Sequence, residues 1–350
     1  MGRRQMNAQQ LMETARALVA GDKGLLAMDE SNPTCNRRFA QAGIPQTIEA
    51  RRAYRELILT TGGLADCING VILYDETIRQ HRKDGKSFIN VVLDAGVIPG
   101  VKVDIGAKDL AGRPGERITE GLDGLRDRLE DYSRMGARFA KWRAVIAMGD
   151  GLPSWGCIEA NAHALARYAV LCQEVGLVPI VEPEVLMDGD QSLELRRATT
   201  ERTLQRVFAQ LDAQGAMLEG MILKPNMAIS GLACTTQASV SEVAEATVSC
   251  LLRVVPAAVP GIAFLSGGQS GELASARLSA INLRFKASGK TPPWALAFSF
   301  ARAIQQPALE IWAGKEANRE AAQRALLHRA RCNVAARRGE YVASMETIAA

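Results

Sequence analysis

The chain has few of the residues from which metal centres and disulfide frameworks are built. It contains only three histidines, His81, His163 and His328, and they are far apart in the sequence. Its seven cysteines are scattered and include no Cys-x-x-Cys pair. A metal centre needs several ligands and a disulfide framework needs paired cysteines. The sequence therefore predicts no metal and no cofactor, and reduced thiols as in a cytosolic protein.

The sequence also lacks the long runs that direct a chain to a membrane or to nucleic acid. No apolar run approaches the roughly 18 residues of a membrane span. The 42 Lys and Arg nearly balance the 38 Asp and Glu, with no long basic segment. The arginines near the N-terminus have no apolar stretch behind them, so no secretory signal is expected. These features predict a cytoplasmic protein that binds neither membranes nor nucleic acid.

What the chain does contain is a regular alternation of two patterns. Short apolar runs typical of buried strands lie at residues 24–28, 70–74, 97–104, 138–143, 178–184, 221–223, 261–268 and 295–302. Helical patterns lie at residues 1–20, 46–60, 118–135, 156–175, 192–214, 239–255, 269–285 and 312–338. Residues 106–116, rich in glycine and basic side chains, are predicted to form a loop.

Strands that alternate with helices pair in parallel, and eight such units close into a barrel. A doubly wound open sheet fits less well, because no Gly-x-Gly-x-x-Gly follows the first strand. No linker divides the chain. We therefore predict that residues 1–350 form a single (β/α)8 barrel of the TIM type, with outer helices, an N-terminal helix and a short C-terminal tail from about residue 340.

In such a barrel the carboxyl ends of all strands meet at one mouth. Polar side chains at these ends are Asp29, Lys102, Lys141, Arg143, Glu182, Glu184, Lys224, Ser266 and Arg302. Pro225 should end the strand directly after Lys224, because proline cannot donate to a sheet ladder. A lysine in this place can snorkel to solvent. Burial can instead lower its pKa and give a neutral amine, which attacks carbonyl groups and forms a Schiff base.

The neighbouring strand ends offer acid–base partners for such a lysine. Glu182 and Glu184 lie on one face of their strand, where like charges raise a carboxyl pKa and suit proton transfer. Lys141 can pair with these carboxylates or lower the pKa of Lys224 further. In imine chemistry one amine attacks the carbonyl, and acid–base groups remove the hydroxyl of the adduct as water.

Ser266-Gly267-Gly268 precedes a helical pattern and predicts an anion site. Glycines let backbone N–H groups face a ligand, and the helix dipole favours negative charge. A phosphate site at this position is a recurrent barrel feature, and the planar guanidinium of Arg302 suits phosphate. For a second anion across the mouth the sequence offers Arg37, Arg38 and Lys102.

Taken in order, these motifs resemble the class I (Schiff-base) fructose-bisphosphate aldolases from about residue 11 to residue 341. The matching segments are residues 25–31, 141–143, 181–184, 223–227, 265–270 and 290–302. The resemblance implies metal-independent, reversible cleavage of fructose 1,6-bisphosphate to dihydroxyacetone phosphate and glyceraldehyde 3-phosphate, as in glycolysis and gluconeogenesis. It also implies a homotetramer.

The resemblance implies a role for each matching residue. Lys224 resembles the imine-forming lysine, and Glu182 the general acid/base of imine formation and dehydration. Asp29 resembles the carboxylate that takes the C4 hydroxyl proton during carbon–carbon cleavage, while Lys141 and Glu184 match residues that support the imine. The C1-phosphate pocket is expected from Ser266, Gly267 and Arg302, and the C6-phosphate side from Ser31, Arg38, Lys102 and Arg143.

The chain departs from the family pattern in three places. Arg37 stands in place of a lysine and Thr34 in place of a serine, which predicts an altered grip on the C6 phosphate. Phe300-Ala301 replaces a Tyr-Gly pair beside the C1-phosphate pocket. The family tail usually ends in a tyrosine that folds over the active site, whereas the last tyrosine here is Tyr341. We expect proton transfer at the enamine stage to use another group or to be slower.

Other interpretations make different predictions. Another Schiff-base barrel aldolase, transaldolase-like or specific for deoxyribose phosphate, predicts one phosphate pocket and a different donor. A preference for sedoheptulose 1,7-bisphosphate or fructose 1-phosphate is a closer variant. A non-catalytic scaffold that binds polyanions or filaments through its basic mouth would not need Asp29, Glu182 and Lys224 together.

Overall fold

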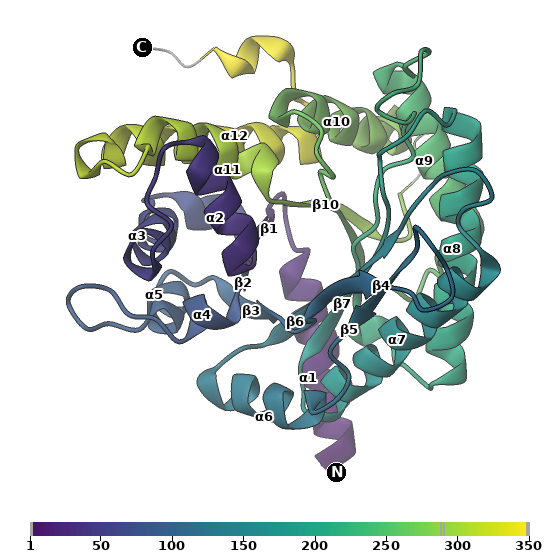
Figure 1. The fold of residues 1–350 in the computed structure, drawn as a ribbon, viewed down its shortest axis with the longest axis horizontal. Coiled ribbons are helices and arrows are strands. Elements are labelled where there is room, and N and C mark those ends of the chain that lie inside the picture. Colours follow the sequence, from purple (N-terminus) through teal and green to yellow (C-terminus); the bar gives the residue numbers. More distant parts are fainter. Residues whose placement is uncertain (1–2, 288, 290, 348–350) are drawn as a thin grey trace.

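Eight parallel strands form a closed barrel in a computed structural model of the chain, which describes residues 3–287, 289 and 291–347 (Figure 1). Around the barrel their order is β1-β10-β9-β8-β7-β6-β3-β2. Their bounds are β1 Gly24–Ala27, β2 Ile68–Leu73, β3 Ile98–Lys102, β6 Phe139–Ile146, β7 Val178–Val185, β8 Ile222–Leu223, β9 Gly261–Phe264 and β10 Ala295–Phe300. The predicted (β/α)8 barrel is confirmed. Lys290 of the matching segment and the last three residues of the predicted tail lie outside the described residues.

The helices surround this barrel (Figure 1). They are α1 Arg3–Leu18, α2 Asn32–Gln41, α3 Ile48–Leu59, α4 Asp75–Ile78, α5 Phe88–Asp94, α6 Leu125–Met135, α7 Trp155–Glu174, α8 Leu193–Ala213, α9 Val240–Val254, α10 Gly271–Ala287, α11 Arg302–Trp312 and α12 Arg319–Arg337. Single 3-10 turns are η1 Leu64–Asp66, η2 Leu218–Gly220, η3 Glu316–Asn318 and η4 Ala343–Glu346. Serine caps begin three of the long helices, because the hydroxyls of Ser154, Ser192 and Ser239 accept free backbone N–H groups of the first turn.

The region after β3 differs from the prediction. Residues 106–120, predicted as a loop leading into a helix, form an antiparallel hairpin of β4 (Gly106–Asp109) and β5 (Arg117–Glu120). The predicted helix over 118–135 therefore begins only at Leu125. Gly121 and Gly124 have φ values of 124° and 65°, which other residues rarely adopt, and this turn separates the hairpin from the helix.

Two further helical assignments are corrected. Helix α2 was not predicted, because Asn32–Gln41 contains few apolar residues. The predicted helix over 312–338 is wrong at its start, since residues near 312 belong to the end of α11 and α12 begins at Arg319. Ala313 and Gly314, both with positive φ, end α11.

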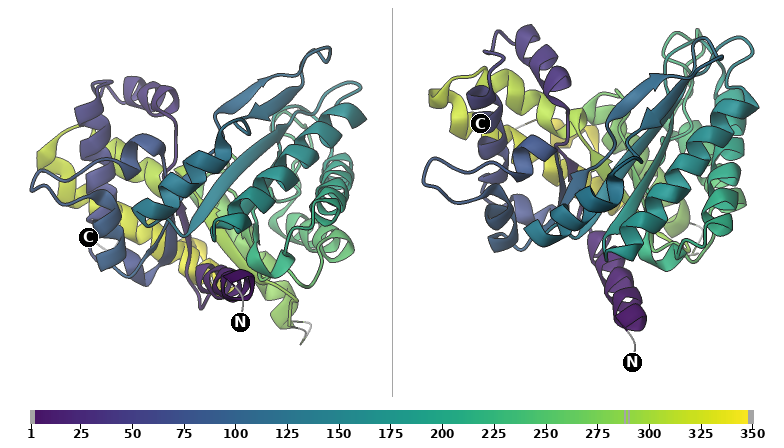
Figure 2. Two further views of the ribbon diagram at one scale, coloured as in Figure 1. Left: turned by 90° about the horizontal axis from the view of Figure 1, so that it is seen from below. Right: turned by 60° about the horizontal axis from the view of Figure 1, so that its bottom comes forward.

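Helix α1 closes the amino end of the barrel. Leu11, Ala15 and Leu18 on α1 pack against inward-facing apolar residues such as Leu25 and Ile180 in one buried cluster. Figure 2 shows α1 at one end of the barrel, with the β4–β5 hairpin at the opposite end. The amino end of the barrel is therefore filled by apolar side chains, which leaves the carboxyl end for a polar site.

The outer face of the barrel packs against the helices through large side chains. Trp142 on β6 and Tyr168 on α7 are fully buried, with ring centroids 5.6 Å apart. The Tyr168 hydroxyl donates to the carbonyl oxygen of Ala140 at 2.7 Å. These contacts fix α7 against β6, and replacing Trp142 by alanine would cost about 3–5 kcal/mol.

None of the helices within the described residues combines the length and apolar character that crossing a membrane requires. The seven cysteines all carry free thiols, and six of them are buried.

Candidate active site

A cavity of about 1020 Å³ opens at the carboxyl ends of the barrel strands. All twelve residues that the sequence singled out line it: Asp29, Ser31, Arg38, Lys102, Lys141, Arg143, Glu182, Glu184, Lys224, Ser266, Gly267 and Arg302. The structure therefore brings together residues that the sequence spreads over more than 270 positions.

The alternation of side chains along each strand explains this convergence. On β6, Phe139 belongs to the apolar cluster inside the barrel, and Lys141 and Arg143 follow it on the same face at two-residue steps. On β7, Ile180 is followed in the same way by Glu182. These two strands thus present an apolar residue to the closed amino end and charged residues to the cavity.

The centre of the cavity is a cluster of two lysines and two carboxylates. Lys141 Nζ lies 2.7 Å from Asp29 Oδ2 and 3.2 Å from Glu182 Oε2. Lys224 Nζ lies 3.4 Å from Glu182 Oε1. All four side chains are buried, with relative exposures of 3–8%. The carboxylate of Glu182 therefore lies between two buried amines.

Burial and the neighbouring charges set the ionisation of this cluster. Burial raises the pKa of Asp29, but the charges of Lys141 and Lys224 outweigh it and lower that pKa to about 2. Burial lowers the pKa of Lys141, yet Asp29 and Glu182 outweigh this effect and raise it above the ordinary value for lysine. Asp29 is therefore a carboxylate and Lys141 an ammonium at neutral pH.

Backbone and side-chain hydrogen bonds hold Lys224 at the end of β8. Its N–H donates to the carbonyl oxygen of Val181 at 2.8 Å, and Pro225 then ends the ladder as expected. Asn226 fixes the next part of the chain: its Oδ1 accepts the N–H of Val185 at 3.0 Å, and its Nδ2 donates to Thr200 Oγ1 at 3.2 Å. The amine of Lys224 is thus placed by a rigid strand end.

Glu184 has its own cationic partner and does not share one with Glu182. Its carboxylate accepts a hydrogen bond from Arg143 Nε. Burial lowers the pKa of Arg143, but the charge of Glu184 outweighs this effect, so that the pKa is raised overall. The two glutamates thus face the cavity with separate partners. Both charges also raise the pKa of Arg143, and a role of this like-charged pair in proton transfer stays a prediction.

Asp104 is a residue of this site that the prediction did not include. Its Oδ1 lies 2.6 Å from Lys102 Nζ and accepts the N–H of Gly106 at 3.1 Å, while Oδ2 accepts the N–H of Arg143 at 3.3 Å. It is buried and lines the cavity. The signal was its place two residues after Lys102 at the end of a predicted strand. Asp104 fixes the position of the Lys102 ammonium.

Ser299 is a second residue that the prediction missed. It lies on β10 and lines the cavity, and its Oγ has no hydrogen-bond partner among the described residues although the side chain is buried. A buried hydroxyl without a partner costs free energy. This hydroxyl is therefore available to a polar group in the cavity. The sequence signal for Ser299 was its place two residues after Ala297, on the same face of the strand.

The loop between β9 and α10 forms one end of the cavity. Gly267 and Gly268 have φ values of 58° and 100°, a conformation that glycine adopts without strain. A Cβ on Gly267 would lie 2.9 Å from Met187 Cε, and one on Gly268 would lie 3.4 Å from Arg302 Nη2. The loop thus brings backbone next to the Arg302 guanidinium, where N–H groups and a cation can hold an anion together.

The side of the mouth formed by β1 and α2 carries further cations. Glu30 accepts from Arg38 and, at 3.1 Å, from Arg55, so that Arg38 is held at the cavity wall. The Ser31 hydroxyl donates to Thr34 Oγ1 at 3.2 Å at the start of α2. Arg37 also lines the cavity. The second anion-binding side predicted from the sequence therefore has several cations in place.

Tyr341, the last tyrosine of the chain, is directed elsewhere. Its hydroxyl donates to Glu346 Oε1 at 2.7 Å, and it lines a separate groove along α10. It is not among the residues that line the central cavity. Within the described residues, Tyr74 and Tyr132 line the cavity and Tyr341 does not.

Comparison with known proteins places the chain among well-defined relatives. The family model described as "Fructose-bisphosphate aldolase class-I" matches residues 10–350. A "probable fructose-bisphosphate aldolase class 1" of Xanthomonas campestris pv. campestris is 55% identical over 96% of this chain and 99% of its own length. A cytosolic fructose-bisphosphate aldolase of Arabidopsis thaliana is 48% identical over 95% of this chain and 84% of its own length.

A solved structure shows the same fold. It is the fructose-bisphosphate aldolase of Plasmodium falciparum, in complex with TRAP and a small-molecule inhibitor. Its TM-score to this chain is 0.93, with 43% sequence identity and 96% of each chain covered.

Proposed function

The chain belongs to the family of class I fructose-bisphosphate aldolases, which are lyases, and we propose that it cleaves fructose 1,6-bisphosphate reversibly through a Schiff base on Lys224. The products are dihydroxyacetone phosphate and glyceraldehyde 3-phosphate. One observation carries this proposal: Glu182 lies within 3.4 Å of Lys224 Nζ and within 3.2 Å of Lys141 Nζ in a buried site. A carboxylate in that place can move protons to and from the amine that reacts.

Imine formation begins with a proton transfer from Lys224 to Glu182. The neutral amine attacks the C2 carbonyl of the substrate, and one of the two protons on its nitrogen moves to the former carbonyl oxygen, which becomes the hydroxyl of a carbinolamine. Glu182 then returns its proton to this hydroxyl, which leaves as water, and the nitrogen lone pair forms the iminium. Lys141 stays protonated through these steps because Asp29 and Glu182 raise its pKa. It holds both carboxylates in place.

Carbon–carbon cleavage uses the iminium as an electron sink. The electron pair of the C3–C4 bond moves into the iminium and gives an enamine, while the C4 hydroxyl loses its proton and becomes the aldehyde. Asp29 is the carboxylate proposed to accept this proton, and it is ionised at neutral pH. The enamine then takes a proton at C3, and water hydrolyses the imine to release the second product.

The two anion-binding ends of the cavity suit a substrate with two phosphates. The loop at Gly267 and Gly268, with Ser266 and Arg302, is proposed to hold the C1 phosphate. The opposite wall, with Ser31, Arg38, Lys102 and Arg143, is proposed to hold the C6 phosphate. Cationic groups at both ends favour a bisphosphate over a monophosphate. Sedoheptulose 1,7-bisphosphate also has two phosphates. Its use is tested by comparing kcat/KM for this sugar, fructose 1,6-bisphosphate and fructose 1-phosphate.

Trapping tests the proposed reaction directly. The protein is incubated with dihydroxyacetone phosphate in EDTA, reduced with borohydride, and digested for mass spectrometry. The expected result is one stable adduct on Lys224, and its loss in a Lys224→Met variant. An adduct spread over surface lysines, or none, would contradict imine chemistry and favour the scaffold interpretation. Lys315→Met, which removes an exposed lysine, is the matched control.

We further propose that the chain works as a single-domain protomer of a homotetramer in the cytoplasm, in glycolysis and gluconeogenesis. Supporting the first point, one closed barrel contains the strands from residue 24 to residue 300. Supporting the location, relatives of Arabidopsis thaliana are named as cytosolic. Light scattering of the purified protein tests the oligomeric state, with a mass four times that of the chain expected.

A further inference from the structure

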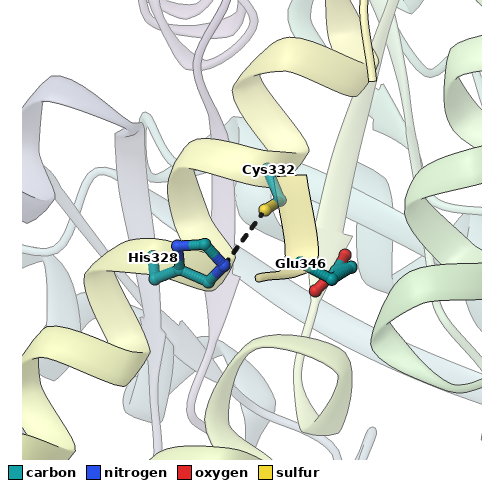
Figure 3. A group of neighbouring side chains, drawn as sticks. All are labelled: His328, Cys332 and Glu346. Atoms are coloured by element: carbon teal, nitrogen blue, oxygen red, sulfur yellow. Dashed lines mark hydrogen bonds between the residues drawn. The ribbon is translucent and has the colours of Figure 1, made fainter. Parts of the chain in front are cut away.

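A group of metal-ligating side chains lies outside the central cavity, where α12 meets the C-terminal segment. His328 and Cys332 are four residues apart on α12, so they lie on one face of the helix. Glu346 reaches them from η4. The ligand atoms of these three residues all lie within 4.8 Å of one another, and His328 Nε2 is 3.7 Å from Cys332 Sγ (Figure 3). In the part of the chain that the structure describes, no other group of three such residues approaches this closely.

The carboxylate of Glu346 is held in place by two neighbours. Its Oε1 accepts a hydrogen bond from Arg329 and another from the Tyr341 hydroxyl at 2.7 Å. Both bonds end on the same oxygen, so the other oxygen can turn to an ion. Outer partners that orient a ligating carboxylate are a regular feature of metal sites, and their loss weakens metal affinity.

Arg329 is itself anchored, so it does not need to move when an ion binds. Its Nη2 donates to Ser275 Oγ at 2.8 Å, and its Nε donates to the carbonyl oxygen of Ala303 at 3.3 Å. Cys332 is buried, and its thiol also approaches the carbonyl oxygen of Met345 at 3.8 Å. The ligands therefore come from one rigid helix and one segment that is already seated against it.

We propose that His328, Cys332 and Glu346 bind one Zn²⁺ ion, with water as the fourth ligand, and that this ion ties the C-terminal segment to α12. An imidazole nitrogen, a thiolate and a carboxylate are the three ligand types that zinc takes in proteins. The thiolate and the carboxylate together balance the two positive charges of the ion. The thiol loses its proton to solvent when the ion binds.

This site is independent of the proposed aldolase reaction. None of its three ligands lines the central cavity, and no step of the imine mechanism uses them. Loss of the ion is therefore expected to leave borohydride trapping on Lys224 intact. Trapping and metal binding can consequently fail separately, and each result is read against its own proposal.

Cobalt substitution tests the site in the full-length protein. The protein is freed of metal by dialysis against a chelator and titrated with Co²⁺, which is coloured, and then with Zn²⁺. We expect one equivalent of Co²⁺ to give a thiolate charge-transfer band and the visible bands of a tetrahedral ion, both removed by Zn²⁺. Cys332→Ser should abolish the thiolate band. Cys234→Ser, which removes the one thiol that is not buried, should leave it unchanged.

Two further measurements separate a built site from a chance thiol. Tyr341→Phe removes one hydrogen bond to Glu346 without touching a ligand, and it should weaken Zn²⁺ affinity by about tenfold to a hundredfold. Zn²⁺ should also slow amide hydrogen exchange in residues 341–347. A wild-type protein without the thiolate band, or a band that persists in Cys332→Ser, would overturn the proposal. If the Zn²⁺ affinity is unchanged in both Tyr341→Phe and Glu346→Gln, Glu346 is not a ligand, and the proposed tie between the C-terminal segment and α12 is wrong.

Discussion

Replacing Lys141 by methionine tests the electrostatic account of the central cluster. The fall of the Asp29 pKa from 3.8 to about 2 corresponds to about 2 kcal/mol of stability at neutral pH. Burial opposes this fall and is the largest single influence on Asp29. Without Lys141, the buried carboxylate of Asp29 loses its ion-pair partner, and Glu182 keeps its contact with Lys224. Removing one partner of a buried ion pair costs about 3–5 kcal/mol, which is the expected loss in the free energy of unfolding at pH 7.

The pH dependence of this loss distinguishes charge from packing. In the wild-type protein the pKa of Asp29 is lower folded than unfolded, so its contribution is fully present above pH 3.8 and is lost as the pH falls toward 2. In Lys141→Met burial should raise the folded pKa above 3.8, and protonation then relieves the buried charge. The difference in stability between the two proteins should therefore shrink as the pH is lowered from 7 to 4.

Urea unfolding followed by circular dichroism at both pH values measures these quantities. Lys315→Met, at an exposed lysine, should change the free energy of unfolding by no more than about 0.5 kcal/mol. The double variant with Asp29→Asn should lose less than the sum of the two single variants, because the removed charges are partners. A loss for Lys141→Met that is as small as that of the control, or that is independent of pH, would refute the reasoning.

Three other substitutions test the site. Glu182→Gln should slow formation of the trappable adduct by about 10²–10⁴-fold in single turnovers, and a normal rate would contradict its acid–base role. Gly267→Ala should raise KM for the bisphosphate. Gly43→Ala, also at positive φ but with open space around it, should cost only about 1 kcal/mol of stability and leave KM unchanged. The same KM in Gly267→Ala as in Gly43→Ala would argue against the anion loop. Asp104→Ala frees Lys102 and should raise KM about tenfold, or roughly 1.4 kcal/mol of phosphate binding, with kcat little changed; steady-state kinetics would show a fall in kcat instead if Asp104 acted on the chemistry.

The strands of the barrel were predictable from two signals, a short apolar run and polar residues or a proline directly after it. An apolar run at β7 is followed by Glu182 and Glu184, and the run before Lys224 is followed by Pro225. The short helix α2 gives neither a clear period nor an apolar stripe, and its stability comes from packing of Phe39 in the core. Because tertiary packing stabilises such a short helix, the local sequence pattern alone does not identify it.

The candidate site shows the same division. Charged residues at strand ends could be found from the sequence, because burying a charge inside a barrel costs free energy unless a partner of opposite charge lies nearby. Ser299 could not be ranked, since only the folded cavity shows that its hydroxyl lacks a partner. The group of His328, Cys332 and Glu346 was also missed, because counting histidines does not detect a mixed set of ligands joined by a returning chain. Pairing partners and orphaned atoms are properties of the fold.

The two central lysines show why partners, and not residue type, decide a role. Both are buried at the carboxyl ends of barrel strands, but Lys141 has two carboxylates within 3.2 Å and Lys224 has one at 3.4 Å. One proton transferred from Lys224 to Glu182 neutralises both of those groups. The cluster then keeps one ammonium, Lys141, beside one carboxylate, Asp29, and remains electrically balanced. The same transfer from Lys141 would leave a neutral amine between two groups that need its charge. This geometry supports the proposal that Lys224 is the nucleophile and Lys141 the fixed cation.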